Sequence, residues 1–273
     1  MKPVFTAKNV SKSFRNVQAL DDVSFALPNG LSLLLGPNGS GKTTLIRIAS
    51  SLLRPDSGKV KLLGYDPFTQ FDKLVGNVTF AFQKHPVPSS MEVKNFLKGI
   101  SEERGADGYE NIIDVFKLQE HIDKQFKHLS GGFKRRVTLA QAFIGDPDFV
   151  IVDEPFANLD LESRFHISNL INNIANEQDV SLLVVTHVIS SLQADHITVL
   201  YSGQVALSEM YSKLDLDTVQ SYVLEKNDEE IVVETQDELK ELLNDGANLV
   251  NVTKKDFNSF LEEKFVNERK NKK

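Results

Sequence analysis

The sequence contains no cysteine in its 273 residues, which excludes disulfide bonds, thiolate zinc sites and iron–sulfur clusters held by cysteine. It also has no run of about 18 apolar residues, the length that would indicate a membrane-spanning helix. The first residues, MKPVFTAKNVSKSF, lack the apolar stretch of a signal peptide. We therefore expect a cytoplasmic protein that reaches a membrane only through a partner.

The sequence also has no excess of basic residues. The formal net charge is −7, whereas general nucleic-acid binders carry a basic balance or a basic patch. Hydrophobic residues make up 41% of the chain and charged residues 25%, which is ordinary for a folded globular protein. We expect no nucleic acid among the partners.

The chain does contain short apolar runs that alternate with amphipathic segments. Near-continuous apolar runs of this kind are typical of strands buried in a parallel sheet, and they occur at residues 31–36, 149–154 and 180–187. Segments with helical spacing occur at residues 43–53, 137–145 and 164–175. The alternation predicts an α/β fold.

Three regions differ in their patterns. Residues 1–215 carry the strand and helix alternation of a large α/β domain, with a helical subdomain at about 86–145 where strand signals are absent. Residues 216–273 read as strand, helix, strand, helix, which predicts a small α+β domain.

A phosphate-binding loop is predicted directly after the first buried strand. Residues 36–43, GPNGSGKT, fit the pattern G-x-x-x-x-G-K-[ST] between a strand and a helix. The glycines let backbone N–H groups turn towards phosphate oxygens, and the helix start adds its positive dipole end. Lys42 is expected on the outer phosphates and the Thr43 hydroxyl on Mg²⁺. A Gly-rich turn alone would require neither. The predicted nucleotide-binding residues of this loop are Gly36, Pro37, Asn38, Gly39, Ser40, Gly41, Lys42, Thr43 and Thr44.

Two acidic residues end the second buried run. Asp153 and Glu154 lie at the carboxyl end of the strand in FVIVDEP, the edge where α/β sheets bind ligands. Asp153 suits a contact to Mg²⁺, and Glu154 suits a general base that orients and deprotonates a water molecule. The alternative is that both carboxylates only cap the turn at Pro155.

Two further polar residues follow strand-like runs. Gln83 ends NVTFAFQ and His187 ends LLVVTH, so each is expected to reach the outermost phosphate or its attacking water. Gln83 is also a predicted metal contact. Either residue could instead be an ordinary polar residue at the edge of the core.

A second anion-binding helix start is predicted far downstream of the first. In HLSGGFKRRVTLAQAF, residues 128–143, a serine and two glycines precede a helical pattern. The Ser130 hydroxyl and the amides of Gly131 and Gly132 would be aimed at an anion.

The order of these motifs resembles the nucleotide-binding subunit of an ATP-binding cassette (ABC) transporter over roughly residues 2–210. The motifs, in order, are Phe14, 36-GPNGSGKTT-44, Gln83, 129-LSGG-132, 151-IVDEP-155, 157-ANLD-160 and His187. LSGG is the discriminating segment, since general P-loop kinases lack it. The resemblance implies a P-loop NTPase cassette with a mixed sheet core and a helical subdomain.

The resemblance also implies ATP, Mg²⁺ and a second cassette. In the family two cassettes, identical or different, meet head to tail, and the LSGG segment of one closes over the phosphates held by the other. Phe14 stands where the family places an aromatic residue on adenine, although it could be an ordinary core residue. Asp160 matches a loop that crosses the dimer, and it could also be a helix cap.

A separate transmembrane permease is the second partner that the resemblance implies. Its contact surface would be residues 83–105, on the cytoplasmic face of the membrane. Phe133 replaces the Gln that is commonest in the family, and with the following KRR and the C-terminal extension it resembles the export-type subfamily. The alternatives are a soluble ABC ATPase in cofactor assembly, translation or DNA repair, and a P-loop kinase outside the family.

Overall fold

The computed structural model describes the chain in two units, Met1–Tyr211 and Ser212–Lys273. The described residues are 2–83, 87–106, 109–177, 179–187, 192–210, 220–226, 229–233 and 248–254. The division at residue 211 lies near the predicted boundary at residue 215.

A six-stranded sheet forms the centre of the first unit, in the order β5-β6-β7-β3-β8-β9. All neighbouring pairs are parallel except β8 and β9, so the sheet is mixed, as predicted. The strands are β3 (Leu31–Leu35), β5 (Val78–Ala81), β6 (Phe149–Asp153), β7 (Ser181–Thr186), β8 (His196–Tyr201) and β9 (Gln204–Met210).

The three buried runs read from the sequence are β3, β6 and β7. Every residue in them is buried, which explains their near-continuous apolar character. They are direct neighbours in the sheet, in the order β6-β7-β3, and they run in parallel. Their carboxyl ends therefore bring Gly36, Glu154 and His187 to one edge.

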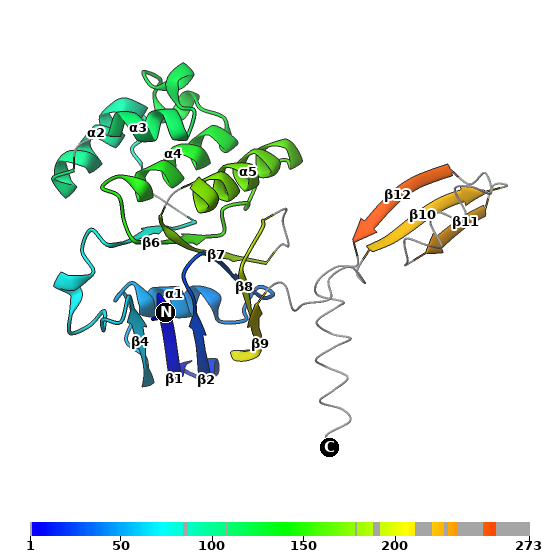
Figure 1. Cartoon of the computed structure of the whole chain (residues 1–273), viewed down its shortest axis with the longest axis horizontal. Helices are drawn as coiled ribbons and strands as arrows, with labels where there is room; N and C mark the ends of the chain where they lie inside the picture. Colours follow the sequence, from blue (N-terminus) through cyan, green and yellow to red (C-terminus); the bar gives the residue numbers. More distant parts are fainter. Residues whose placement is uncertain are drawn as a thin grey trace. The chain divides into compact units, whose positions relative to one another are not determined.

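A second sheet of three antiparallel strands was not predicted. Its order is β2-β1-β4, with β1 at Phe5–Phe14, β2 at Val17–Leu27 and β4 at Ser57–Leu62. Helix α1 (Lys42–Ala49) lies between this sheet and the larger one (Figure 1), and one hydrophobic core joins all three. Helix α1 ends before the predicted residue 53, because Ser51 has a left-handed backbone with φ 62°.

The remaining helices of this unit gather beyond the β5–β6 side of the larger sheet (Figure 1). They are α2 (Val93–Arg104), α3 (Tyr109–Val115), α4 (Gly131–Phe143) and α5 (Leu161–Glu177), with single 3₁₀ turns at Gln119–His121 and Phe126–His128. A further 3₁₀ turn, Phe71–Lys73, comes between β4 and β5. Helices α2, α3 and α4 fall within the predicted helical subdomain. None of the described helices is long and apolar enough to cross a bilayer.

The second unit contains three antiparallel strands in the order β11-β10-β12. They are β10 (Gln220–Lys226), β11 (Glu229–Val233) and β12 (Asn248–Lys254). Strands β11 and β12 match the two predicted strands, whereas β10 was missed. The two predicted helices fall outside the described residues.

Candidate functional site

The phosphate loop follows β3 and ends at Gly41, the N-cap of α1. Gly41 has φ 105°, and a Cβ there would lie 2.5 Å from the Ala19 carbonyl oxygen, so only glycine fits. A Cβ on Gly36 would collide with the Leu200 carbonyl oxygen and the Ser40 side chain. A Cβ on Gly39 would meet nothing within 4 Å, which leaves that part of the loop open to a ligand.

The loop opens onto a pocket of about 650 Å³, within the usual range of small-molecule sites. Several predicted site residues meet there although they are far apart in the sequence. The pocket is lined by Phe14, Val17, Ala19, Asn38, Gly39, Ser40, Gly41, Lys42, Thr43, Thr44, Gln83, Glu154, Phe156, Ala157, Asn158, Arg164 and His187.

Lys42 is buried at the base of this pocket. Its Nζ donates to the carbonyl oxygens of Gly36 at 2.6 Å and Pro37 at 3.1 Å. It also lies 3.8 Å from Oε1 of Glu154. Burial lowers the pKa of Lys42, and the charges of Glu154 and Asp153 oppose that shift. The ammonium group is therefore held by the loop that would surround a phosphate.

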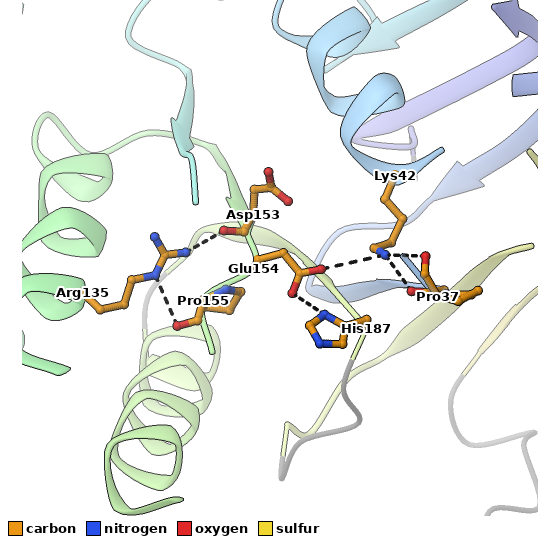
Figure 2. A network of polar contacts seen from close by, with 8 residues as sticks. Pro37, Lys42, Arg135, Asp153, Glu154, Pro155 and His187 are labelled. Atoms are coloured by element: carbon orange, nitrogen blue, oxygen red, sulfur yellow. Dashed lines mark hydrogen bonds and ion pairs between the residues drawn. The ribbon is translucent and has the colours of Figure 1, made fainter. Parts of the chain in front are cut away.

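Glu154 links Lys42 to His187 (Figure 2). One carboxylate oxygen faces Lys42, and the other lies 2.9 Å from Nδ1 of His187. The backbone of Glu154 is left-handed, with φ 48°, and its N–H donates to the Val185 carbonyl oxygen at 2.7 Å. Such a conformation costs a non-glycine residue about 1–3 kcal/mol. The Glu154 carboxylate thus contacts two side chains across the pocket, Lys42 and His187, whereas the alternative was that it only caps the turn at Pro155.

Asp153 is buried next to Glu154, and its Oδ1 has no hydrogen-bond partner among the described residues. Burial raises the pKa of Asp153 and so does the charge of Glu154, while Arg135 and Lys42 oppose the shift. An unsatisfied buried carboxylate oxygen is costly unless a cation or its water satisfies it. The oxygen ligands available here, from Asp153, Thr43 and Gln83, suit Mg²⁺.

Phe14 ends β1 and lines the pocket beside Val17 and Ala19. Its side chain is 45% exposed, so the alternative of an ordinary core phenylalanine is wrong. Nζ of Lys12 lies 5.7 Å from the ring centroid. The ring is open to a ligand and can stack on a flat base.

Replacing Phe14 by alanine is expected to weaken ATP binding about 2–10-fold, because an aromatic contact contributes about 0.5–1.5 kcal/mol. Inorganic triphosphate, which has no base, should bind equally well to both proteins. Titration with a fluorescent ATP analogue would measure the change, with Phe14→Tyr as the control that keeps the ring. Equal ATP affinity of the alanine variant and the wild type would remove Phe14 from the base site.

The second anion-binding helix start does not line this pocket in the single chain. Ser130 caps α4, and its Oγ accepts a hydrogen bond from the Phe133 N–H at 3.2 Å. A Cβ on Gly132 would lie 2.5 Å from Oγ of Ser163 on α5, so a larger residue there would require Ser163 to move. The Ser-Gly-Gly segment is thus a formed helix start with its own packing constraint.

Phe133 points into the helical subdomain. Its side chain is buried, with its ring centroid 4.5 Å from that of His121 and the guanidinium of Arg136 5.3 Å from the ring centroid. The phenylalanine therefore fills space inside the subdomain and leaves the Ser130 hydroxyl and the glycine amides as the polar groups of the helix start.

Asp160 precedes α5 and does not line the pocket. Its carboxylate accepts hydrogen bonds from the Ser163 N–H at 2.7 Å and the Ser163 hydroxyl at 3.2 Å. These bonds lower the pKa of Asp160. In the single chain Asp160 is a helix cap, and a role across a dimer stays a prediction.

Arg135 was missed as a site residue, since the sequence KRR was read only as a subfamily feature. Its guanidinium is buried and donates to the carbonyl oxygens of Asp153 and Pro155, next to Glu154 (Figure 2). Three consecutive basic residues on a helix point in different directions and cannot all face solvent. This was the one feature of the sequence that could have indicated a buried arginine. The sequence could not show which of them faces inwards.

Comparison with known proteins finds the sequence pattern of the ABC transporter family at residues 20–157. The zinc import ATP-binding protein ZnuC of Rickettsia conorii is 33% identical over 187 residues, which cover 68% of this chain and 77% of ZnuC. The spermidine/putrescine import ATP-binding protein PotA of Protochlamydia amoebophila is 34% identical over 210 residues, or 72% of this chain and 55% of PotA. The chain thus spans little more than half of PotA.

Solved structures share the fold. The nucleotide-free ATP-binding cassette of an ABC transporter superposes with a TM-score of 0.66 and 23% identity, over 76% of this chain and 91% of that one. The ATP-binding subunit of another ABC transporter gives 0.67 and 22% identity, over 77% and 90%. The predicted cassette fold is therefore confirmed.

Proposed function

The chain belongs to the ABC transporter family of ATP-binding subunits, and from this premise we propose that it hydrolyses ATP to power a separate membrane permease. Subunits of this family are ATPases coupled to transport. The observation that carries the proposal is the meeting of Lys42, Glu154 and His187 in one pocket beside the phosphate loop.

ATP fits the residues of the pocket. Phe14 would stack on adenine, the amides of residues 38–44 would surround the phosphates, and Lys42 would contact the outer ones. Mg²⁺, held through Thr43, Asp153 and Gln83, would neutralise phosphate charge when bound. Hydrolysis is phosphoryl transfer to water, so the protein contributes positioning and charge.

The carboxylate of Glu154 is the group that would orient and deprotonate the attacking water. His187 is within hydrogen-bond distance of the same carboxylate and can hold its orientation. Gln83 lines the pocket from the end of β5, close to where the outer phosphate would lie. These roles make Lys42, Glu154, His187 and Gln83 the proposed catalytic residues.

A second cassette would complete the site. Ser130, Gly131 and Gly132 form a helix start that does not line the pocket of its own chain. In a head-to-tail pair each Ser-Gly-Gly segment would close over the phosphates held by the other subunit, as the family resemblance implies. Asp160 would lie at the same interface. The two anion sites of the sequence then form one composite site, made twice.

Replacing Ser130 by arginine is expected to leave ATP affinity of the isolated chain within about twofold and to lower hydrolysis by roughly 10²-fold. The added side chain would fill the space of the partner's phosphates. Ser57→Arg, on an exposed position of β4, is the matched control. A loss of ATP affinity in the isolated Ser130 variant would instead place Ser130 in its own subunit's pocket.

The permease would contact the region of residues 83–105, which includes Gln83 and α2. Residues 84–86 of this surface lie outside the described residues. Affinity capture of the tagged chain from detergent-solubilised native membranes, with mass spectrometry of the partners, tests this part. Recovery of a polytopic membrane protein would support a subunit bound to the cytoplasmic face. Recovery of soluble partners alone would favour the alternative, a soluble ABC ATPase.

The direction of transport is a finer proposal. Phe133, the KRR segment and the strands of the second unit favour export, by resemblance to export-type cassettes. The relatives favour import, since ZnuC and PotA are named import ATP-binding proteins. We propose export and keep import as the alternative. With the chain on the outside of proteoliposomes, ATP-driven cargo entry indicates export, and release of preloaded cargo indicates import.

A further inference from the structure

Arg135 occupies an unusual position on α4. Its side chain is buried, and within the described residues its hydrogen bonds all go to backbone carbonyl oxygens. Nη2 donates to Asp153 at 2.6 Å, Nε to Pro155 at 3.2 Å and Nη1 to Phe82 at 3.0 Å, with the Gln83 oxygen 3.5 Å from Nη1. Figure 2 shows the fork reaching the two carbonyls that flank Glu154.

The acceptors belong to two neighbouring strand ends. Phe82 and Gln83 follow β5, while Asp153 ends β6, and the two strands pair in parallel. One guanidinium therefore ties together the backbone segments that carry Gln83, Asp153 and Glu154. A planar fork with several donors can do this, whereas the point charge of a lysine cannot reach all of these acceptors.

Burying a charged residue in this space costs more desolvation free energy than burying an apolar one. Burial lowers the pKa of Arg135 to about 10, with the charges of Asp153 and Glu154 opposing the shift. Buried ionic groups can often be replaced by apolar residues without loss of stability. The cost is consistent with a role other than packing.

Helix α4 connects this fork to the Ser-Gly-Gly segment. Ser130 caps the helix, and Arg135 lies little more than one turn further along it. Because a helix moves as a rigid element, displacement of its start would also displace the guanidinium and the carbonyls that it holds. Helix α4 also reaches β5 through Gln141, whose Nε2 donates to the Phe80 carbonyl oxygen at 3.2 Å, but Arg135 is bonded to the backbone directly beside Gln83 and Glu154.

We propose that Arg135 is a positioning residue that transmits engagement of Ser130 and the following glycines with a neighbouring subunit's phosphates to Gln83 and Glu154. Docking of α4 on the second cassette then favours the working position of the catalytic base. This inference rests on the proposed function, and it adds a route by which one composite site of the pair senses the completion of the other.

The test compares Arg135→Met with Arg136→Met. Arg136 is the matched control because it is the adjacent arginine of the same helix, but it donates to the Lys117 carbonyl oxygen at 3.4 Å and lies over the Phe133 ring, away from the strand ends. For Arg135→Met we expect kcat to fall roughly 10–100-fold, as when an outer-shell partner is removed, with KM for ATP within about twofold. Arg136→Met should retain both values.

A second readout does not depend on turnover. Binding of a fluorescent ATP analogue is measured with and without Mg²⁺, and thermal unfolding checks the fold. Arg135→Met should bind the analogue normally without Mg²⁺ and gain less affinity from Mg²⁺ than the control does. If it does not fold, Arg135→Lys replaces it, and kcat should fall by a smaller factor because fewer carbonyls are reached.

Two results would overturn the inference. One is a kcat for the Arg135 variant that equals the Arg136 control. The other is an equal loss of kcat, KM and metal-free ATP binding, which would mark a general structural role. Absence of hydrolysis by the wild-type chain would instead contradict the proposed function.

Discussion

Replacing Glu154 by glutamine is expected to reduce ATP hydrolysis roughly 10²–10⁴-fold while ATP still binds. The amide has nearly the shape of the carboxylate but cannot accept the proton of the attacking water. In the wild type the two carboxylate oxygens of Glu154 lie 3.8 Å from Nζ of Lys42 and 2.9 Å from Nδ1 of His187. The substitution therefore changes the residue that joins the polar contacts of the site. With hydrolysis blocked, the ATP-bound dimer should accumulate.

The measurement is single-turnover hydrolysis of radiolabelled ATP together with size-exclusion chromatography in ATP. Glu162→Gln is the control, since Glu162 is an exposed acidic residue in the first turn of α5. A Glu154 variant that hydrolyses ATP at the wild-type rate would remove Glu154 from the role of general base.

Replacing Lys42 by methionine is expected to weaken ATP binding about 10–100-fold, because hydrogen bonds to charged groups contribute about 1.5–3 kcal/mol. Methionine keeps much of the buried volume but leaves the carbonyl oxygens of Gly36 and Pro37 without their donor. The loss should grow with the number of ligand phosphates, from adenosine to ATP.

Calorimetric titration with adenosine, ADP and ATP would measure this dependence. Arg47→Met, at an exposed position in the last turn of α1, is the control for the loss of one positive charge. A loss of affinity that is the same for adenosine and ATP would contradict a phosphate contact and indicate a distorted pocket.

The parts of the fold predicted from the sequence are those in which one residue type dominates an element. Strands β3, β6 and β7 are buried along their whole length, so their sequences are nearly continuous apolar runs. The polar residues of the site follow these runs directly. Their meeting in space follows from the parallel order of the strands.

The antiparallel sheet could not be predicted in the same way. Strand β1 pairs with β2 through three register shifts, which break the alternation of buried and exposed residues.

In the larger sheet, strand β8 carries the polar residues His196 and Thr198 in its buried interior, and their partners Glu209 and Ser208 come from β9. Only tertiary pairing makes those residues compatible with a core.

Within the site, the sequence indicated residue types but not their local conformation. Nothing in FVIVDEP predicts that Glu154 adopts a left-handed backbone and turns towards Lys42 and His187. The inward orientation of Arg135 could not be predicted either, because its acceptors are backbone carbonyl oxygens, which every residue carries whatever its type.

Mixing two inactive variants, Ser130→Arg and Lys42→Met, tests the composite site most directly. In a head-to-tail pair of one copy each, the intact phosphate loop of the first faces the intact Ser-Gly-Gly segment of the second. The account predicts that the mixture hydrolyses ATP faster than the sum of the two variants measured alone. A mixture that is no more active than that sum would contradict a hydrolytic site shared between two copies of this chain.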